Sequence, residues 1–363
     1  MEKENLAIEN LKRYKERLDF FLKEYFIGKI DEAKKIDPLA VQTAEMIRDF
    51  VLSGGKRIRP ALVYYGYLAA GGSDNENIVK ASMSIELAHI FLLIHDDIID
   101  RDNMRHNSPT VHEKYRAWGE ELKLNKNEAE HFGNSMAIVA GDVVYSMANE
   151  IIYTSDFSPK IILSALKKIQ KIVYRTIPGE MLDILMEAKK TATEDEIMRM
   201  YEGKTARYTF EGPLHLGVAL AGKGDDEKLL KTFTKYSLLA GKAFQLQDDI
   251  LGIFGDQQKI GKTVGADVIE GKQTLLFIKA LELGNPEQRK KIKQFFGKKD
   301  LDLSELKIFR RIIKDTGSLK YSQDLSSDLI EKALVTLEKH KFENAEAQLF
   351  LKGIAEYIIK REV

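Results

Sequence analysis

Residues 81–100 read ASMSIELAHIFLLIHDDIID, a long apolar stretch that ends in aspartates. Apolar side chains recur along it at spacings of three and four residues, so Met83, Leu87, Ile90 and Ile94 fall on one broad face of a helix. The stretch therefore predicts a buried helix that carries several carboxylates at its end.

The same helical spacing continues through most of the chain, and residues 228–253 show it again. Strand signals are weak, because no alternating apolar run is closed by a hairpin turn. We expect Pro178 and Pro213, each beside a glycine, to interrupt helices. No shift in composition marks a linker. The pattern predicts one all-α domain over residues 1–363, built as a single large bundle of ten or more helices.

Composition limits the classes of function. Lys and Arg number 56, as do Asp and Glu, and this balance argues against a nucleic-acid-binding protein. The chain has no cysteine, which excludes disulfides and thiol catalysis. The N-terminal residues lack an apolar signal core, and the apolar stretches at 85–95 and 272–283 are too short or too charged to span a bilayer. We expect a cytoplasmic protein without a transmembrane segment.

Two acidic segments carry the chemistry. Asp96 and Asp100 are four residues apart, so a helix places them on one face, one turn apart. Carboxylate oxygens suit Mg²⁺, which often bridges protein carboxylates to substrate phosphates. Alone, the segment could equally be a solvated helix end. However, Asp248 and Asp249 follow a second apolar helix, and two such helices facing each other would form an acidic metal cavity.

A basic turn is the third cluster. Residues 54–60 read GGKRIRP, and Lys56, Arg57 and Arg59 suit an anion with several oxygens, although a solvated surface turn would look the same. Acidic clusters that need cations and basic clusters that need anions are satisfied together by diphosphate esters with magnesium. Two differently built anion sites imply two substrates. Further cations beside polar or glycine-containing segments are Arg105, Lys204, Lys262 and Lys272.

Four motifs occur in one order: GGKRIRP at 54–60, DDIID at 96–100, KTARYTF at 204–210 and FQLQDDILGIFGD at 244–256. On these motifs the chain resembles the all-trans isoprenyl diphosphate synthases, and most of all the archaeal type of geranylgeranyl diphosphate synthase. The resemblance implies a helical bundle around a deep central cavity, usually a homodimer. It also implies an enzyme that condenses isopentenyl diphosphate with allylic diphosphates of C5 to C15.

The resemblance implies a role for each matching residue. Three Mg²⁺ ions would be held by Asp96, Asp100 and Asp248, with Asp97 and Asp249 in support. The two diphosphates would bind to Gly55, Lys56, Arg59, His89, Arg105, His106, Lys262 and Lys272. The carbocation would be stabilised by Lys204, Thr205 and Gln245. His106 stands where many members carry a second arginine. Asp183 matches an acid of the family that helps to orient the arginine, Arg105.

Product length is expected to depend on the helix before Asp96. Phe91 lies five residues upstream, roughly 7–8 Å along the axis, where an aromatic ring would form a floor. Leu92 and Ala88 lie beside this position. An aromatic at this place alone resembles the archaeal enzymes, so we expect a C20 product, with farnesyl or longer products as alternatives. Ordinary core packing of Phe91 is the simpler reading. A terpene cyclase would not need the basic turn, and a non-catalytic subunit commonly lacks one acidic motif.

Overall fold

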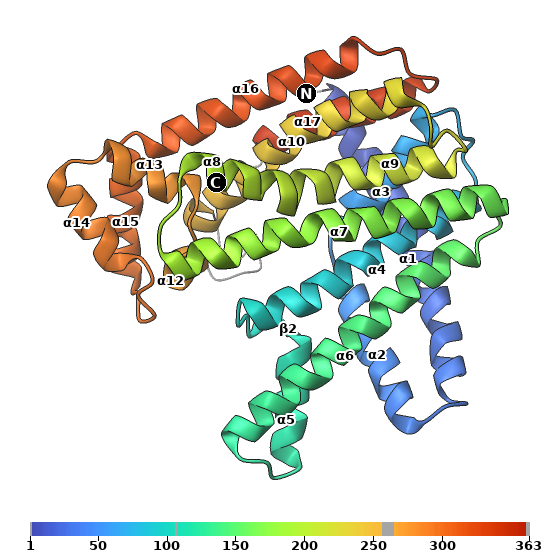
Figure 1. Ribbon diagram of the computed structural model, residues 1–363, viewed down its shortest axis with the longest axis horizontal. Coiled ribbons are helices and arrows are strands. Elements are labelled where there is room, and N and C mark those ends of the chain that lie inside the picture. Colours follow the sequence, from blue (N-terminus) through green and yellow to red (C-terminus); the bar gives the residue numbers. More distant parts are fainter. Residues whose placement is uncertain (1, 106–107, 256–264, 361–363) are drawn as a thin grey trace. The chain divides into compact units, whose positions relative to one another are not determined.

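The structure, a computed structural model, describes residues 2–105, 108–255 and 265–360 (Figure 1). The chain divides into two compact units. Unit 1 comprises Met1–Ala7, Gln170–His215 and Asp225–Val363, and unit 2 comprises Ile8–Ile169 and Leu216–Gly224. Each unit is described by itself below. The expectation of a single domain stays a prediction.

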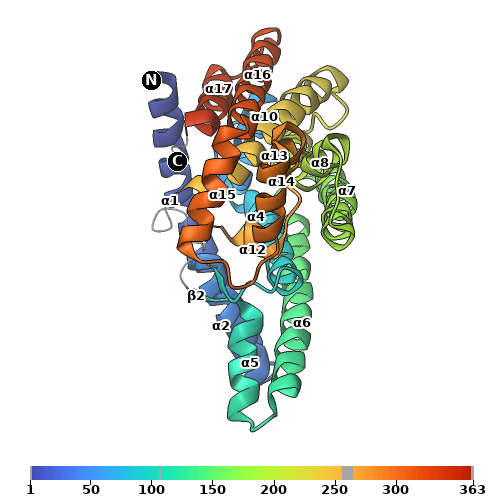
Figure 2. The ribbon, with the colours of Figure 1, turned by 90° about the vertical axis from the view of Figure 1, so that its left-hand side faces the viewer.

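Unit 2 holds the first half of the helices. Its core pair is α4 against α6, and α3 packs on α4. Helix α5 packs along α6 (Figure 2). Two very short strands form a hairpin directly after α4. The elements are α1 (Glu2–Ala33), α2 (Pro38–Leu52), α3 (Ile58–Ala69), α4 (Glu76–Ile99), β1 (Met104–Arg105), β2 (Ser108–Pro109), α5 (Val111–Glu121), α6 (Lys126–Tyr153), the start of α7 (Pro159–Lys189) and the end of α9 (Gly212–Leu220).

Helix α4 forms as its sequence predicts. Asn75 caps it, since its side chain accepts a hydrogen bond from the Ile78 N–H at 3.1 Å. Its apolar face is buried, with Leu87, Ala88 and Ile94 at 0% exposure. Among the described helices, α4 is the one with the length and apolar composition of a membrane span, yet 67% of its most apolar window is buried inside the protein. Burial of that kind is typical of a core helix.

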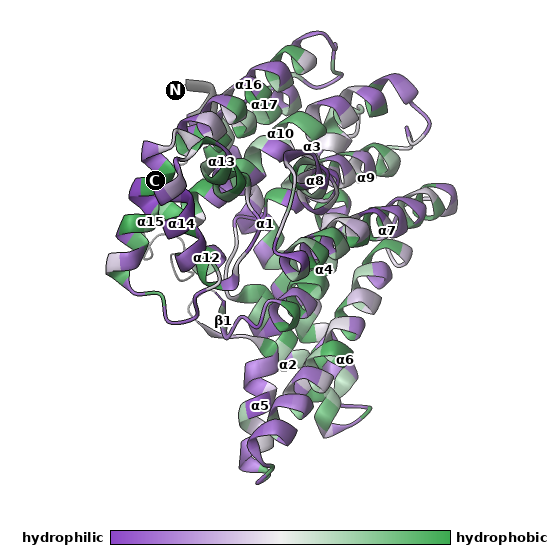
Figure 3. Cartoon of the chain, turned by 60° about the vertical axis from the view of Figure 1, so that its left-hand side comes forward, coloured by the Kyte–Doolittle hydropathy of each residue, from purple (hydrophilic) through white to green (hydrophobic). Residues whose placement is uncertain are grey.

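Unit 1 is built around α10, which packs against η1, α16 and α17 (Figure 1). Helix α13 is mainly hydrophobic, whereas α14 is mainly hydrophilic (Figure 3). The further elements are α8 (Glu194–Met200), η1 (Tyr201–Glu211), α10 (Glu227–Phe254), α12 (Ala266–Glu270), α13 (Leu275–Leu283), α14 (Pro286–Phe295), α15 (Leu303–Asp315), α16 (Ser318–Glu338) and α17 (Ala345–Lys360).

Glu211, the last residue of η1, is a buried acid that contacts Thr234 of α10. Burial raises the pKa of Glu211, but the hydrogen bond from Thr234 at 2.7 Å and the nearby His215 and Arg207 outweigh it, so the pKa lies below its usual value. Arg207 Nη1 donates to the same carboxylate at 2.9 Å. Glu211 is therefore held in its ionised form inside unit 1.

The all-α prediction is confirmed, but the expected breaks at the prolines are wrong. Helix α7 continues through Pro178, where the missing N–H costs one bond of a 31-residue helix. Pro213 is the second residue of α9, which follows η1 directly. A proline is tolerated there, because the N–H groups of the first helical turn lack carbonyl partners within their own helix.

Candidate active site

The first acidic segment ends α4 in unit 2. The Asp100 N–H donates to the Asp96 carbonyl at 2.8 Å, so the two residues stand one helical turn apart, as predicted. The C-terminal end of a helix carries a partial negative charge, which adds to the attraction for a cation. Both carboxylates are half-buried. An all-oxygen donor set at a helix C-terminus fits a hard divalent cation such as Mg²⁺.

Asp97 differs from its neighbours, because it is fully buried and forms an ion pair with the guanidinium of Arg105. Arg105 Nε donates to Asp97 Oδ1 at 2.6 Å, and its Nη2 also approaches Asp102 at 3.4 Å. Arg105 itself is buried and lies in β1. The pair fixes the hairpin against the end of α4, which fits the supporting role expected of Asp97. His106, the next residue, lies outside the described residues.

The basic turn at 54–60 is held by one of its own cations. Gly54 and Gly55 have φ of 147° and 112°, and Arg57 has a φ of 56°, which is uncommon for a residue with a side chain. Arg57 is buried and donates to Asp19 at 2.9 Å and to Glu86 at 2.5 Å. It also donates to the Val51 carbonyl at 2.7 Å. Arg57 therefore anchors the turn and is not available to a ligand.

Arg59 of the turn contacts α4. Arg59 Nη1 lies 3.0 Å from His89 Nε2, so the structure brings together two residues predicted to bind isopentenyl diphosphate. Lys56 and Gly55 are exposed on the same turn. His89 lies seven residues before Asp96, or about 10 Å along α4. The predicted anion site at Arg59 and His89 thus lies about two to three turns from the Asp96 and Asp100 carboxylates in unit 2.

The ring of Phe91 contacts two other aromatic rings. The His95 ring lies 4.8 Å from it and the Tyr145 ring of α6 lies 4.9 Å from it, measured between centroids. His95 Nε2 contacts the Ile138 carbonyl at 3.1 Å. Gly141 makes room for this histidine, since a Cβ there would lie 2.4 Å from His95 Nε2. Ala88 is buried and Leu92 half-buried; the contribution of Tyr145 was missed, because it comes from another helix.

In unit 1, the π-helix η1 presents two of the predicted residues. Lys204 Nζ forms ion pairs with Asp183 at 2.7 Å and with Glu180 at 2.9 Å. Glycines allow this part of α7 to approach η1, since a Cβ on Gly179 would lie 2.4 Å from the backbone nitrogen of Lys204. π-helical turns occur frequently at functional sites. Asp183 was expected to orient Arg105, and the contact that the structure gives it is with Lys204.

The second acidic segment lies on α10. Asp249 is buried and accepts hydrogen bonds from Tyr201 and, at 2.9 Å, from Gln245 Nε2. Burial, the nearby Asp267 and Asp248 raise the pKa of Asp249 to about 8, against the effect of its hydrogen bonds. Thr205 donates to Gln245 Oε1 at 2.5 Å. Three predicted residues, Thr205, Gln245 and Asp249, are thus joined in one network, and Asp249 fits a supporting role.

Two lysines remain among the predicted diphosphate-binding residues. Lys272 lies 3.4 Å from Glu270, within the loop between α12 and α13. Lys262 lies outside the described residues. Among the residues that the structure describes, no group of three His, Asp or Glu side chains converges as a metal site. The assignment of ligands to individual ions therefore stays a prediction.

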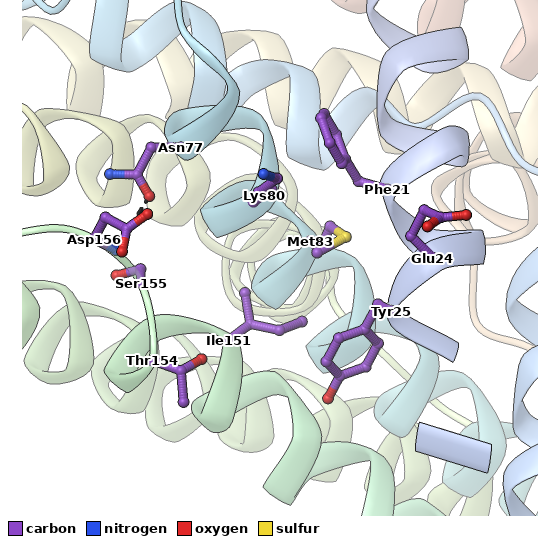
Figure 4. A pocket seen from close by; sticks show the side chains of 10 residues that line it. All are labelled: Phe21, Glu24, Tyr25, Asn77, Lys80, Met83, Ile151, Thr154, Ser155 and Asp156. Carbon is purple, nitrogen blue, oxygen red and sulfur yellow. Dashed lines mark hydrogen bonds between the residues drawn. The ribbon is translucent and has the colours of Figure 1, made fainter. Parts of the chain in front are cut away.

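A pocket of about 260 Å³ lies elsewhere in unit 2, between α1, the start of α4 and the end of α6 (Figure 4). Lys80 lies on its wall, with its ammonium 4.8 Å from the centre of the Phe21 ring. Lys80 precedes Asp96 by 16 residues, or about 24 Å along α4. The pocket is therefore separate from the predicted site.

The all-α fold, the two acidic segments and the basic turn agree with the isoprenyl diphosphate synthase family expected from the motifs, and comparison with known proteins supports this family. The chain is 34% identical to the geranylgeranyl diphosphate synthase of Methanosarcina mazei, over 87% of this chain and 88% of the relative. It is 33% identical to that of Saccharolobus solfataricus, over 85% and 87%. A crystal structure of the Corynebacterium glutamicum geranylgeranyl pyrophosphate synthase, complexed with isoprenyl diphosphate and magnesium, superposes with a TM-score of 0.90 at 30% identity, over 97% of this chain and 99% of that one.

A sequence profile of the polyprenyl synthetase family matches residues 41–313. The chain belongs to this family.

Proposed function

We propose that this chain is a trans-prenyltransferase that condenses isopentenyl diphosphate with allylic diphosphates, and that its main product is geranylgeranyl diphosphate. One observation carries the proposal most: His89, which pairs with Arg59, precedes Asp96 by about two turns and Asp100 by about three turns along α4 and its C-cap. A direct anion site beside a site for metal-bound diphosphate suits two diphosphate substrates. The relatives named above support the choice of product.

Asp96, Asp100 and Asp248 would hold Mg²⁺, which we expect as three ions. The bound Mg²⁺ would neutralise charge on the departing diphosphate. Asp97 and Asp249 would support these ligands. In the reaction, the C–O bond of the allylic diphosphate breaks and leaves an allylic cation. The double bond of isopentenyl diphosphate then attacks this cation to form a C–C bond. Loss of a proton to the released diphosphate creates the new double bond.

The chain's own residues would bind and orient the reactants. Lys56, Arg59 and His89 would bind the diphosphate of isopentenyl diphosphate, and Arg105 and Lys204 that of the allylic substrate. The Lys204 carbonyl and the oxygens of Thr205 and Gln245 would stabilise the cation by their negative partial charge. Lys262, Lys272 and His106 are proposed as further diphosphate contacts.

The experiment is incorporation of labelled isopentenyl diphosphate with C5, C10 and C15 primers, with sizing of the products. We expect a C20 product with every primer, and activity that is lost on chelation and returns with Mg²⁺. Titration of Mg²⁺ against a non-reactive allylic analogue would give the number of ions, expected to be three. Asp96→Asn should abolish incorporation, while Asp315→Asn, on the surface of unit 1, should not. No incorporation with any primer would refute the proposal.

We also propose a homodimer in the cytoplasm. Helix α7 exposes apolar side chains at Tyr174 (78%), Met181 (63%) and Ile177, and α6 exposes Val139 (61%) and Ile138. Apolar faces of this extent mark interaction surfaces more often than free ones. Light scattering should give twice the chain mass, and Met181→Lys should shift the distribution toward monomer. Fractionation of cells should leave the protein outside the membrane pellet.

A further inference from the structure

The residues around Gln245 form a hydrogen-bonded relay that reaches well beyond the predicted site. Tyr201, the first residue of η1, is buried at 0% exposure and donates to Asp249 Oδ2. The Leu275 N–H, at the start of α13, donates to the Tyr201 hydroxyl at 3.2 Å. Asp249 Oδ1 accepts from Gln245 Nε2 at 2.9 Å, and Gln245 Oε1 accepts from Thr205 at 2.5 Å.

The Leu275 N–H can only donate, so the oxygen of Tyr201 accepts from it and the hydroxyl hydrogen points to Asp249. The NH₂ group of Gln245 donates to the other oxygen of Asp249, and the carbonyl oxygen of Gln245 accepts from Thr205. The orientation of the amide follows from its neighbours on α10 and η1.

The orientation of this amide decides its effect on a cation. An amide oxygen carries negative partial charge and the NH₂ group carries positive partial charge, so a reversed Gln245 would repel the allylic cation. We propose that Tyr201 is a positioning residue of the reaction, which acts through Asp249 to keep the carbonyl oxygen of Gln245 toward Thr205. The inference rests on the proposed function.

Removal of the Tyr201 hydroxyl leaves Asp249 Oδ2 without this donor and loosens the carboxylate that fixes Gln245. We expect Tyr201→Phe to lower kcat roughly tenfold, in line with the loss of one oriented hydrogen bond. The Michaelis constants of both substrates should stay within about twofold of wild type, because no diphosphate contact changes. A merely structural role would not separate kcat from the Michaelis constants in this way.

Tyr236→Phe is the matched control. Tyr236 is equally buried in unit 1, and its hydroxyl donates to the Leu351 carbonyl at 2.8 Å, outside the relay. Both variants should lose similar thermal stability, but only Tyr201→Phe should lose kcat. In a Gln245→Ala background, Tyr201→Phe should have no further effect on kcat, because the two changes break one chain of contacts.

Three results would overturn the inference: an unchanged kcat in Tyr201→Phe, an equal loss in Tyr236→Phe, or additive losses with Gln245→Ala. If Tyr201→Phe does not fold, Asp249→Asn replaces it, since an asparagine can present its NH₂ group to Gln245 and reverse the amide. Full kcat in Asp249→Asn would then refute the relay. A wild-type protein without incorporation would refute the proposed function itself, whereas an active wild type with an unaffected variant refutes the relay alone.

Discussion

Phe91→Ala should lengthen the product. The Phe91 ring contacts the rings of His95 and Tyr145, with centroid distances of 4.8 and 4.9 Å, and these contacts hold it in place. The product is expected to grow along α4 toward this ring. One turn deeper on α4, Ala88 is small and buried. Loss of the ring therefore adds about 5.4 Å of depth, one helical turn, before the next obstruction. We expect the main product to shift from C20 to C25, one five-carbon unit longer.

The assay is extension of a C15 primer with labelled isopentenyl diphosphate, removal of the diphosphate and reversed-phase chromatography. Tyr145→Ala should also lengthen the product, because the two rings form one floor. Leu93→Ala is the matched control: Leu93 is also half-buried on α4 but points about 200° away from Phe91 around the helix. Phe91→Ala should be destabilised by less than the roughly 3–5 kcal/mol of a fully buried ring. An unchanged product profile in a folded Phe91→Ala protein would refute the floor.

Three further changes test the surroundings of the site. Glu86→Gln weakens the ion pair that anchors Arg57. It should therefore raise the Michaelis constant of isopentenyl diphosphate, measured by steady-state kinetics, and lower the free energy of unfolding by about 1–3 kcal/mol, measured by urea unfolding. Gly141→Ala should displace His95, cost about 1–3 kcal/mol and broaden the product distribution seen by chromatography. The folded pKa of Glu211 lies below its ordinary 4.5, so its stabilising effect is complete above about pH 4.5 and is lost as the pH falls through the folded pKa. Glu211→Gln should therefore flatten the fall in urea stability below about pH 4.5.

The sequence predicted those features that depend on local spacing. The apolar face of α4, its acidic end and the carboxylates of Asp96 and Asp100 one turn apart all follow from the period of a helix. The predicted helix break at Pro178 was wrong, because the tendency of one proline to break a helix is small compared with the hydrogen bonds and packing of a long helix.

Features that depend on distant pairs could not be predicted. Three cations stand in the basic turn, and sequence alone does not say that Arg57 is the buried one, since its partners Asp19 and Glu86 lie 38 and 29 residues away. Tyr201 carries no motif signal for the same reason: its partner Asp249 is 48 residues away. The division into two units was not predicted from the sequence either, because no change in composition marks the boundaries between the units.

The anchoring of Arg57 has a consequence for folding. The turn that carries Lys56 and Arg59 is held in the folded protein by the ion pairs of Arg57 with Asp19 of α1 and Glu86 of α4. The proposed diphosphate-binding turn thus depends on tertiary contacts that a partly folded chain lacks. A ligand that binds there binds the native state alone and shifts the folding equilibrium toward it, by about 2.7 kcal/mol at a hundredfold excess over its dissociation constant. Substrate supply would then protect the enzyme against unfolding and proteolysis.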